Sequence, residues 1–201
     1  FAGNETELLR RSEFPLAGQH AVYDALAAAA AALLRGAAPL HARIGLTTAQ
    51  PVPHRLERVA TIDGVEFVND TAATAPAAVL AALEAFAGRP IVLIGGGAAK
   101  GVALDELARV AAARTEAVVL LDGTATPGYQ AALLAAGARV FGPYRSMEDA
   151  VRQAAALARP GGVVLLSPGC ASFGLFRDEF HRGEAFRAAV GRLVEERGGA
   201  G

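Results

Sequence analysis

Residues 91–101 read IVLIGGGAAKG, a short apolar run that leads directly into three glycines. A strand without alternation of apolar and polar residues is buried on both faces, which is typical of a parallel sheet covered by helices. Comparable strands are predicted at 118–121, 139–141 and 163–166. Helical segments rich in alanine alternate with them, at 76–86, 104–113, 127–136, 147–158 and about 184–196. The pattern predicts an α/β fold with a parallel sheet and helices on both of its faces.

The chain before residue 91 predicts a hairpin and a domain boundary. Asp63-Gly64 separates two β-rich runs, 56–62 and 65–68, which is a strong hairpin signal. A helix is predicted from Gly18 to Arg35, ended by Gly36. Pro51 and Pro53 favour an extended linker at 47–53. We therefore predict two parts, residues 1–53 and 54–201.

The composition is that of a folded globular protein. Of the 201 residues, 53% are hydrophobic and 19% are charged. A net charge of −1 gives no electrostatic basis for binding nucleic acid or an anionic membrane surface. The single cysteine, Cys170, cannot form an intrachain disulfide, and no apolar run reaches the ~18 residues of a membrane span. We expect a cytoplasmic protein and, because the chain begins with Phe1, a piece of a longer one.

Three loops at the ends of predicted strands carry polar side chains. Residues 69–74 follow the strand 65–68, Lys100 follows 91–94, and Ser172 follows 163–166. Parallel sheets bind ligands beyond the carboxyl ends of their strands, where neighbouring strands lie only ~4.8 Å apart. Two hydroxyls and one ammonium gathered there would suit a small carboxylate or dicarboxylate. This geometry requires the three strands to be parallel and close.

Each of these loops also has a plain structural interpretation. Residues 69–76 could be a helix cap, and Lys100, the only lysine in the sequence, could be solvated. Cys170 is better read as a small buried filler than as a reactive thiol. The glycine loop matches neither a P-loop nor a dinucleotide fingerprint, and Ser172 lacks the surroundings of a hydrolase nucleophile.

The chain resembles the carboxyl-terminal half of the Mur ligases, and within them the branch that adds D-glutamate. The motifs that carry the resemblance run in family order through nearly the whole chain. They are Gly18-Gln19-His20, Pro53-His54-Arg55-Leu56-Glu57, Asn69-Asp70-Thr71-Ala72-Ala73-Thr74, Gly95-Gly96 with Lys100-Gly101, Ser167-Pro168-Gly169-Cys170-Ala171-Ser172-Phe173, and Arg182-Gly183-Glu184-Ala185-Phe186.

The resemblance implies a domain organisation and a reaction. Residues 1–53 would be the tail of a central ATPase domain, and residues 54–201 a Rossmann-like domain that binds the incoming amino acid. In such ligases ATP, with Mg²⁺, phosphorylates the carboxylate of UDP-N-acetylmuramoyl-L-alanine, and the amine of D-glutamate then attacks it, in peptidoglycan precursor synthesis. The P-loop is missing here and the Mg²⁺ ligands would lie mainly outside this sequence, so we expect the piece alone to be inactive. The partners implied are these small molecules, with no nucleic acid or membrane, and the protein would be a monomer.

The resemblance also implies roles for single residues. Thr74 and Lys100 would face the α-carboxylate of D-glutamate, while Ser172 and the backbone near Glu179 would hold its side-chain carboxylate. The catalytic candidates are His54 and Arg55, and Arg55 would reach the phosphates of ATP. Asp70 would contact the ribose region and Asp24 belongs to the nucleotide-binding set. No residue of this chain is assigned to a metal.

Several positions depart from the family pattern. Ala21 and Asp24 replace residues usual near the adenine, Ala72 replaces a common lysine, and Gly174 replaces an aspartate. None of these changes removes a charged or hydroxyl group assigned to D-glutamate. Two alternatives stay open: a ligase of the same kind for another amino acid, and a stand-alone Rossmann-like binding module without ATP chemistry.

Overall fold

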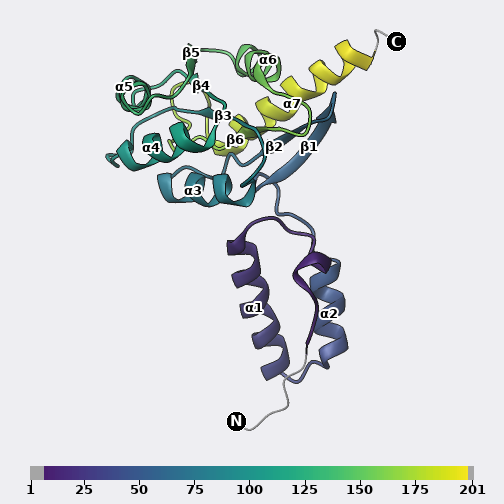
Figure 1. Cartoon of the computed structure of the whole chain (residues 1–201). Helices are drawn as coiled ribbons and strands as arrows, with labels where there is room; N and C mark the ends of the chain where they lie inside the picture. The colour runs from purple at the N-terminus through teal and green to yellow at the C-terminus, as the bar shows by residue number, and fades with distance from the viewer. Residues whose placement is uncertain (1–6, 199–201) are drawn as a thin grey trace. The chain divides into compact units, whose positions relative to one another are not determined.

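A computed structural model describes residues 7–198 of the chain. The chain forms two compact units, one ending at Pro51 and the other beginning at Val52. The first unit contains a 3-10 turn, η1 (Arg11–Glu13), and two helices, α1 (Gln19–Leu34) and α2 (Pro39–Thr47) (Figure 1). The sequence predicted α1 but not α2, which begins with a proline in its first turn, a position that tolerates the missing N–H.

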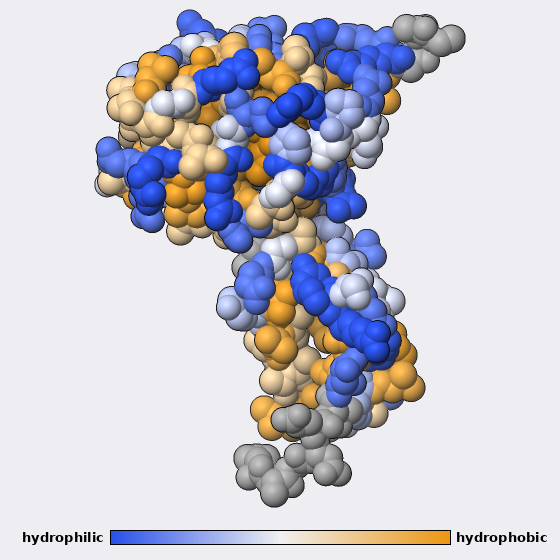
Figure 2. Space-filling view, in the orientation of Figure 1, coloured by the Kyte–Doolittle hydropathy of each residue, from blue (hydrophilic) through white to orange (hydrophobic). Residues whose placement is uncertain are grey.

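The first unit leaves many large apolar side chains in contact with solvent. Phe14 is buried, whereas six others are exposed: Tyr23, Leu26, Leu33, Leu34, Leu40 and Ile44. Figure 2 shows apolar surface over much of the visible face of this unit. Exposed apolar patches are typical of surfaces that bind protein, membrane or a ligand.

The second unit is built on a six-stranded sheet with the order β1-β2-β6-β3-β4-β5. Strands β2, β6, β3, β4 and β5 are parallel, and β1 pairs antiparallel with β2. The strands are β1 (Glu57–Ile62), β2 (Val65–Asn69), β3 (Ile91–Gly95), β4 (Ala117–Leu121), β5 (Val140–Tyr144) and β6 (Val163–Leu166). Asp63 and Gly64 both have positive φ at the β1–β2 turn. The predicted parallel sheet and the predicted hairpin are both confirmed.

Helices cover the sheet on both faces, as the sequence predicted (Figure 1). One apolar core joins the sheet to α6 (Met147–Leu157) and α7 (Glu179–Gly198). The other core joins it to α3 (Pro76–Ala85), α4 (Asp105–Arg114) and α5 (Thr126–Ala135). Neighbouring residues of β3 divide between the cores, Ile94 in the first and Leu93 in the second, because side chains alternate along a strand. No helix between residues 7 and 198 is long and apolar enough to cross a membrane.

Helix α7 begins five residues earlier than the sequence predicted. Asp178 accepts a hydrogen bond from the backbone N of His181 at 2.7 Å through its side chain, which satisfies a free N–H of the first turn. Gly183 lies inside the helix and does not interrupt it. The extra turn brings Glu179, Arg182 and Gly183 against the loop that follows β2.

Gly183→Ala should destabilise the second unit, because a Cβ there would overlap His54 Nδ1 and lie 2.7 Å from Thr71 Cγ2. We expect the free energy of unfolding to fall by about 1–3 kcal/mol, measured by urea titration. Gly191→Ala in the same helix is the matched control, since nothing lies within 4 Å of its added methyl. It should leave stability unchanged or raise it by about 0.5–1 kcal/mol. Equal stability of the two variants would contradict the crowding at Gly183.

Candidate active site

The centre of the site is a contact between the loops that follow β2 and β3. Lys100 Nζ donates a hydrogen bond to Thr74 Oγ1 at 2.8 Å. Strand β6 lies between β2 and β3 and is parallel to both, so the carboxyl ends of all three strands meet at one edge. This is the arrangement of strands that the sequence-based geometry required. Both Lys100 and Thr74 remain open to solvent at least in part, and a ligand can therefore reach them.

The loop after β6 is fixed to both of the other loops by backbone hydrogen bonds. Gly169 N donates to Ala73 O at 2.9 Å, and Ala98 and Ala171 exchange two bonds of 2.8 and 3.0 Å. Ser172 follows directly and is only 4% exposed. A small hollow lies where the three loops meet, and its lining includes Thr74, Lys100, Val102, Gly169 and Cys170.

The glycines after β3 allow this close approach of the loops. Gly97 has a φ of 137°, and a Cβ on it would overlap Ala171 O. Gly123 comes equally close to the backbone of Gly97, whose N donates to Thr126 Oγ1 at 3.2 Å. The glycine-rich run therefore serves contacts between loops.

A buried arginine lies beneath these loops. Arg182 is 1% exposed and donates three hydrogen bonds, from Nε to Thr71 Oγ1 at 2.9 Å, from Nη2 to Thr71 O at 3.0 Å and from Nη1 to Cys170 O at 3.1 Å. Burial lowers the pKa of Arg182 to about 10, so it still carries its charge at neutral pH. Arg182 belongs to one of the sequence motifs, but the sequence predicts no role for it, because its partners are up to 111 residues away.

The site is electropositive. Within residues 7–198, neither Lys100 nor Arg182 forms an ion pair with a carboxylate. Cys170 lies near both cations, and burial raises the pKa of its thiol to about 11, so it stays neutral and does not offset their charge. A thiol of this kind is a filler rather than a nucleophile. An anionic ligand would complement these two charges.

Glu179 is the first residue of α7 and lies at the edge of this cluster. Its backbone O accepts a hydrogen bond from Thr71 Oγ1 at 2.9 Å. The predicted backbone contact near Glu179 therefore lies beside the loop that carries Thr74. Burial lowers the pKa of Arg182, whereas the Glu179 carboxylate raises it, because a nearby negative charge favours the charged guanidinium.

His54 is part of a buried hydrogen-bond network. His54 is 6% exposed, and Asn69 Nδ2 lies 3.0 Å from its Nδ1. The same Nδ2 faces two acceptors, Glu57 Oε2 and Gly183 O, so the amide nitrogen is the donor and Nδ1 accepts. The ring proton is therefore assigned to Nε2, which lies 3.3 Å from Glu184 Oε1.

Arg55 is presented outward by an unusual backbone turn. His54 and Leu56, on either side of it, have φ values of 66° and 43°, a conformation rare for residues with a Cβ. Asp70 holds the turn, because its Oδ1 accepts from Leu56 N at 3.2 Å while its Oδ2 accepts from Ser167 Oγ at 2.8 Å. Burial raises the pKa of the Asp70 carboxyl to about 6, against the opposing effects of Ser167, Leu56 and Arg55.

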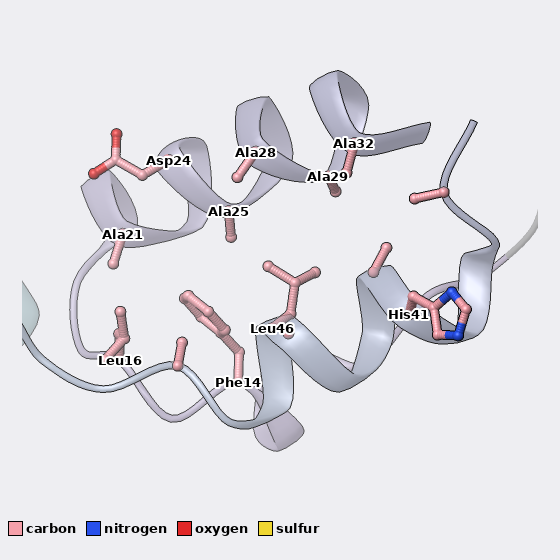
Figure 3. Close-up of a pocket in the computed structure, with 14 residues that line it drawn as sticks. Phe14, Leu16, Ala21, Asp24, Ala25, Ala28, Ala29, Ala32, His41 and Leu46 are labelled. Carbon is pink, nitrogen blue, oxygen red and sulfur yellow. The ribbon is translucent and has the colours of Figure 1, made fainter. Parts of the chain in front are cut away.

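Asp24 belongs to the first unit, on α1. It borders a cavity of about 450 Å³ between α1 and α2, lined largely by alanines together with Phe14, Leu16, His41 and Leu46. In Figure 3 its carboxylate points away from Phe14 and Leu46. Of the predicted site residues, the structure thus brings Thr74, Lys100 and the Ser172 loop together. His54, Arg55 and Asp70 form a second group on the same unit.

The second unit is an α/β domain in which the carboxyl ends of parallel strands bring the Lys100 ammonium and the Thr74 hydroxyl together, with the buried Arg182 nearby. Comparison with known proteins narrows this class. The family model described as Mur ligase, glutamate ligase domain matches residues 54–170, more than half of the chain. The chain belongs to this family.

Relatives of known name share this similarity over nearly the whole chain. The UDP-N-acetylmuramoylalanine–D-glutamate ligase of Roseiflexus sp. strain RS-1 is 53% identical over 190 residues, which cover 94% of this chain and 41% of the relative. The ligase of the same name from Paraburkholderia xenovorans is 42% identical over 184 residues, covering 90% and 35%. The chain therefore spans about two fifths of the length of these relatives.

Solved structures share the fold. The UDP-N-acetylmuramate-alanine ligase of Thermotoga maritima superposes with a TM-score of 0.69 at 17% identity, over 90% of this chain and 39% of that one. The folylpolyglutamate synthase of Mycobacterium tuberculosis, complexed with ADP, gives 0.60 at 19% identity, over 90% and 41%. At these identities the similarity concerns the fold alone.

The buried Asp70 carboxyl should make stability depend on pH. The raised pKa means that the folded protein keeps this proton between about pH 4 and 6, where the unfolded chain has lost it. The stabilisation is therefore complete below about pH 4 and is lost as the pH rises through 6. The shift of the Asp70 pKa from 3.8 to about 6 corresponds to a change of about 3 kcal/mol in the free energy of unfolding.

Asp70→Asn removes this titration, so its unfolding free energy should rise relative to wild type between pH 4.5 and 7.5 in urea titrations. Asp105→Asn, at an exposed position in the first turn of α4, is the control and should show no comparable change between the two pH values. A constant difference between Asp70→Asn and wild type across this range would contradict a buried, neutral Asp70 at low pH.

Proposed function

We propose that this chain is the amino-acid-binding part of an ATP-dependent ligase that adds D-glutamate to UDP-N-acetylmuramoyl-L-alanine. The observation that carries the proposal is the contact of Lys100 Nζ with Thr74 Oγ1 at the edge of the sheet, with Ser172 on the adjoining loop. The names of the relatives at 53% and 42% identity support the choice of D-glutamate over other amino acids.

The two carboxylates of D-glutamate would be bound by different loops. Lys100 and Thr74 would hold the α-carboxylate, where the compact ammonium supplies a full charge. Ser172 would donate to the side-chain carboxylate. Both ends of the amino acid would then be fixed while its amine stays free, so that it can attack an activated carboxyl brought to the same place. Orientation of this kind removes much of the entropic barrier to joining two molecules.

Arg55 and Asp70 fit a nucleotide at the other side of the site. Arg55 is exposed between two residues of left-handed backbone, where it can reach phosphate oxygens, and Asp70 holds that turn. ATP bound there would supply the phosphoryl group that activates the acceptor carboxylate. Residues 7–198 contain no cluster of three or more His, Cys, Asp or Glu side chains suited to a metal. On the family resemblance, we propose that the Mg²⁺ ligands lie mainly in the rest of the ligase.

The first unit is proposed to be the tail of the central ATPase domain. Its exposed apolar side chains are of the kind that pack against further protein, and the relatives extend well beyond the length matched here. The predicted boundary at Pro53 lies two residues beyond the observed division at Pro51. A cytoplasmic location and a monomeric ligase remain predictions.

A chimera tests the proposal, with this chain replacing the matching part of the Roseiflexus ligase. It should release phosphate from ATP with UDP-N-acetylmuramoyl-L-alanine only when D-glutamate is added. L-Glutamate, L-alanine and diaminopimelate should not support the reaction. Turnover with one of these instead would favour a ligase for another amino acid, and a folded chimera without any turnover would favour the stand-alone binding module.

In this chimera, Lys100→Met should reduce kcat/KM for D-glutamate by about 2–4 kcal/mol of transition-state stabilisation, because it removes the charge that meets the carboxylate. Ser172→Ala should cost less, about 1–2 kcal/mol, as the loss of one hydrogen bond to a charged group. The KM for ATP serves as the internal control and should not change. Unaltered D-glutamate kinetics in Lys100→Met would remove Lys100 from the site.

A further inference from the structure

The segment that carries Ser172 is held at both of its ends by one pair of buried side chains. At the near end, Cys170 O accepts from Arg182 Nη1 at 3.1 Å. At the far end, Glu179 O accepts from Thr71 Oγ1 at 2.9 Å. Thr71 and Arg182 are joined in turn, because Nε donates to Thr71 Oγ1 at 2.9 Å and Nη2 donates to Thr71 O at 3.0 Å.

The same pair also belongs to the loop that carries the other half of the site. Thr71 lies three residues before Thr74, and its N donates to Asn69 Oδ1 at 3.3 Å at the end of β2. Thr71 is fully buried and Arg182 is 1% exposed. The pair therefore spans, out of contact with solvent, the gap between the loop with Thr74 and the loop with Ser172.

Only a planar fork can make this set of contacts. Three nitrogens of the Arg182 guanidinium donate at once to acceptors on two different loops, in fixed directions. A lysine at the same position would keep the charge but has a single nitrogen on a flexible stem. The three acceptors are uncharged oxygens, so the contacts fix position rather than neutralise charge.

We propose that Arg182, acting with Thr71, is a positioning residue that sets the distance between the two carboxylate-binding loops and thereby selects the length of the amino acid. The inference rests on the proposed function, in which Lys100 and Thr74 bind one carboxylate of D-glutamate and Ser172 binds the other. D-Aspartate carries the same two charges but is one methylene shorter. With the loops fixed, it would bridge the two sites less well than D-glutamate.

The ratio of kcat/KM for D-glutamate to kcat/KM for D-aspartate tests this role in the chimera described above. Arg182→Lys should lower the ratio about tenfold, the order that one methylene is worth in a binding pocket. It should raise the KM for D-glutamate with less effect on kcat, and leave the KM for ATP unchanged. Arg192→Lys, at an exposed position of α7, is the matched control and should leave the ratio as in wild type.

Two variants of Thr71 test the contact between Thr71 and Arg182 without changing its charge. Thr71→Val keeps the shape of the side chain but loses Oγ1, and should lower the ratio as Arg182→Lys does. Thr71→Ser keeps Oγ1 and should keep the ratio at the wild-type value. An unchanged ratio in Arg182→Lys and in Thr71→Val would overturn the proposal. An equal rise of the KM values for D-glutamate, ATP and UDP-N-acetylmuramoyl-L-alanine would also overturn it, since this would indicate general loss of structure.

A measurement without ligand separates this inference from the proposed function. In the 201-residue chain, Arg182→Lys should speed hydrogen exchange at the backbone amides of Gly169 and Ala171, whose bonds join the loops, by about tenfold or more. Exchange in β4 should stay unchanged. Unaltered exchange at Gly169 and Ala171 would overturn the positioning role whatever the substrate is. A wild-type chimera that shows no turnover with D-glutamate would overturn the proposed function. The exchange measurement would still test whether Arg182 and Thr71 position the two loops.

Discussion

The site depends on the insertion of β6 between β2 and β3. The chain leaves β3, forms β4 and β5 on one side, and returns to the centre of the sheet as its last strand. Backbone bonds then tie the strand ends together, from Asp70 N to Leu166 O at 2.8 Å and from Ser167 N to Ile94 O at 3.2 Å. The loops with Thr74, Lys100 and Ser172 meet only because of this return. No local feature of any one loop would bring these side chains together.

The second unit contains a buried cation, Arg182, whose hydrogen-bond acceptors are all uncharged. Taking a guanidinium out of water is costly, and hydrogen bonds to Thr71 and Cys170 recover only part of that cost. The lowered pKa of Arg182 expresses the remainder. A carboxylate ligand in the neighbouring hollow would offset this cost from outside the protein. In the proposed ligase, the bound and free states would therefore differ in how well the charge of Arg182 is compensated.

The sequence predicted the strands and most of the helices because both signals are local. Strands buried on both faces read as unbroken apolar runs, and the rule for strand ends led to the loops that carry Thr74 and Lys100, whose side chains are in contact. The predicted start of α7, at about residue 184, is five residues late, because Gly183 disfavours a helix locally, whereas in the fold its missing Cβ is what lets α7 approach His54 and Thr71. Arg182 had no visible role because its partners are distant in sequence. The buried position of His54 likewise depends on Asn69 and Glu184, which no spacing in the sequence connects to it.

The two halves of the site share one hydrogen-bonded segment. The loop after β2 begins at Asp70, which holds the turn beside Arg55, and ends at Thr74, which contacts Lys100. Between them, Ala72 N donates to His54 O at 3.1 Å, so the turn and the loop are joined a second time. In the proposed ligase, the nucleotide and the amino acid would thus touch opposite ends of a segment only five residues long. Displacement of that segment by one ligand would affect binding of the other, because the segment is bonded along its length: Asp70 and Ala73 to the loop after β6, and Thr71 to α7.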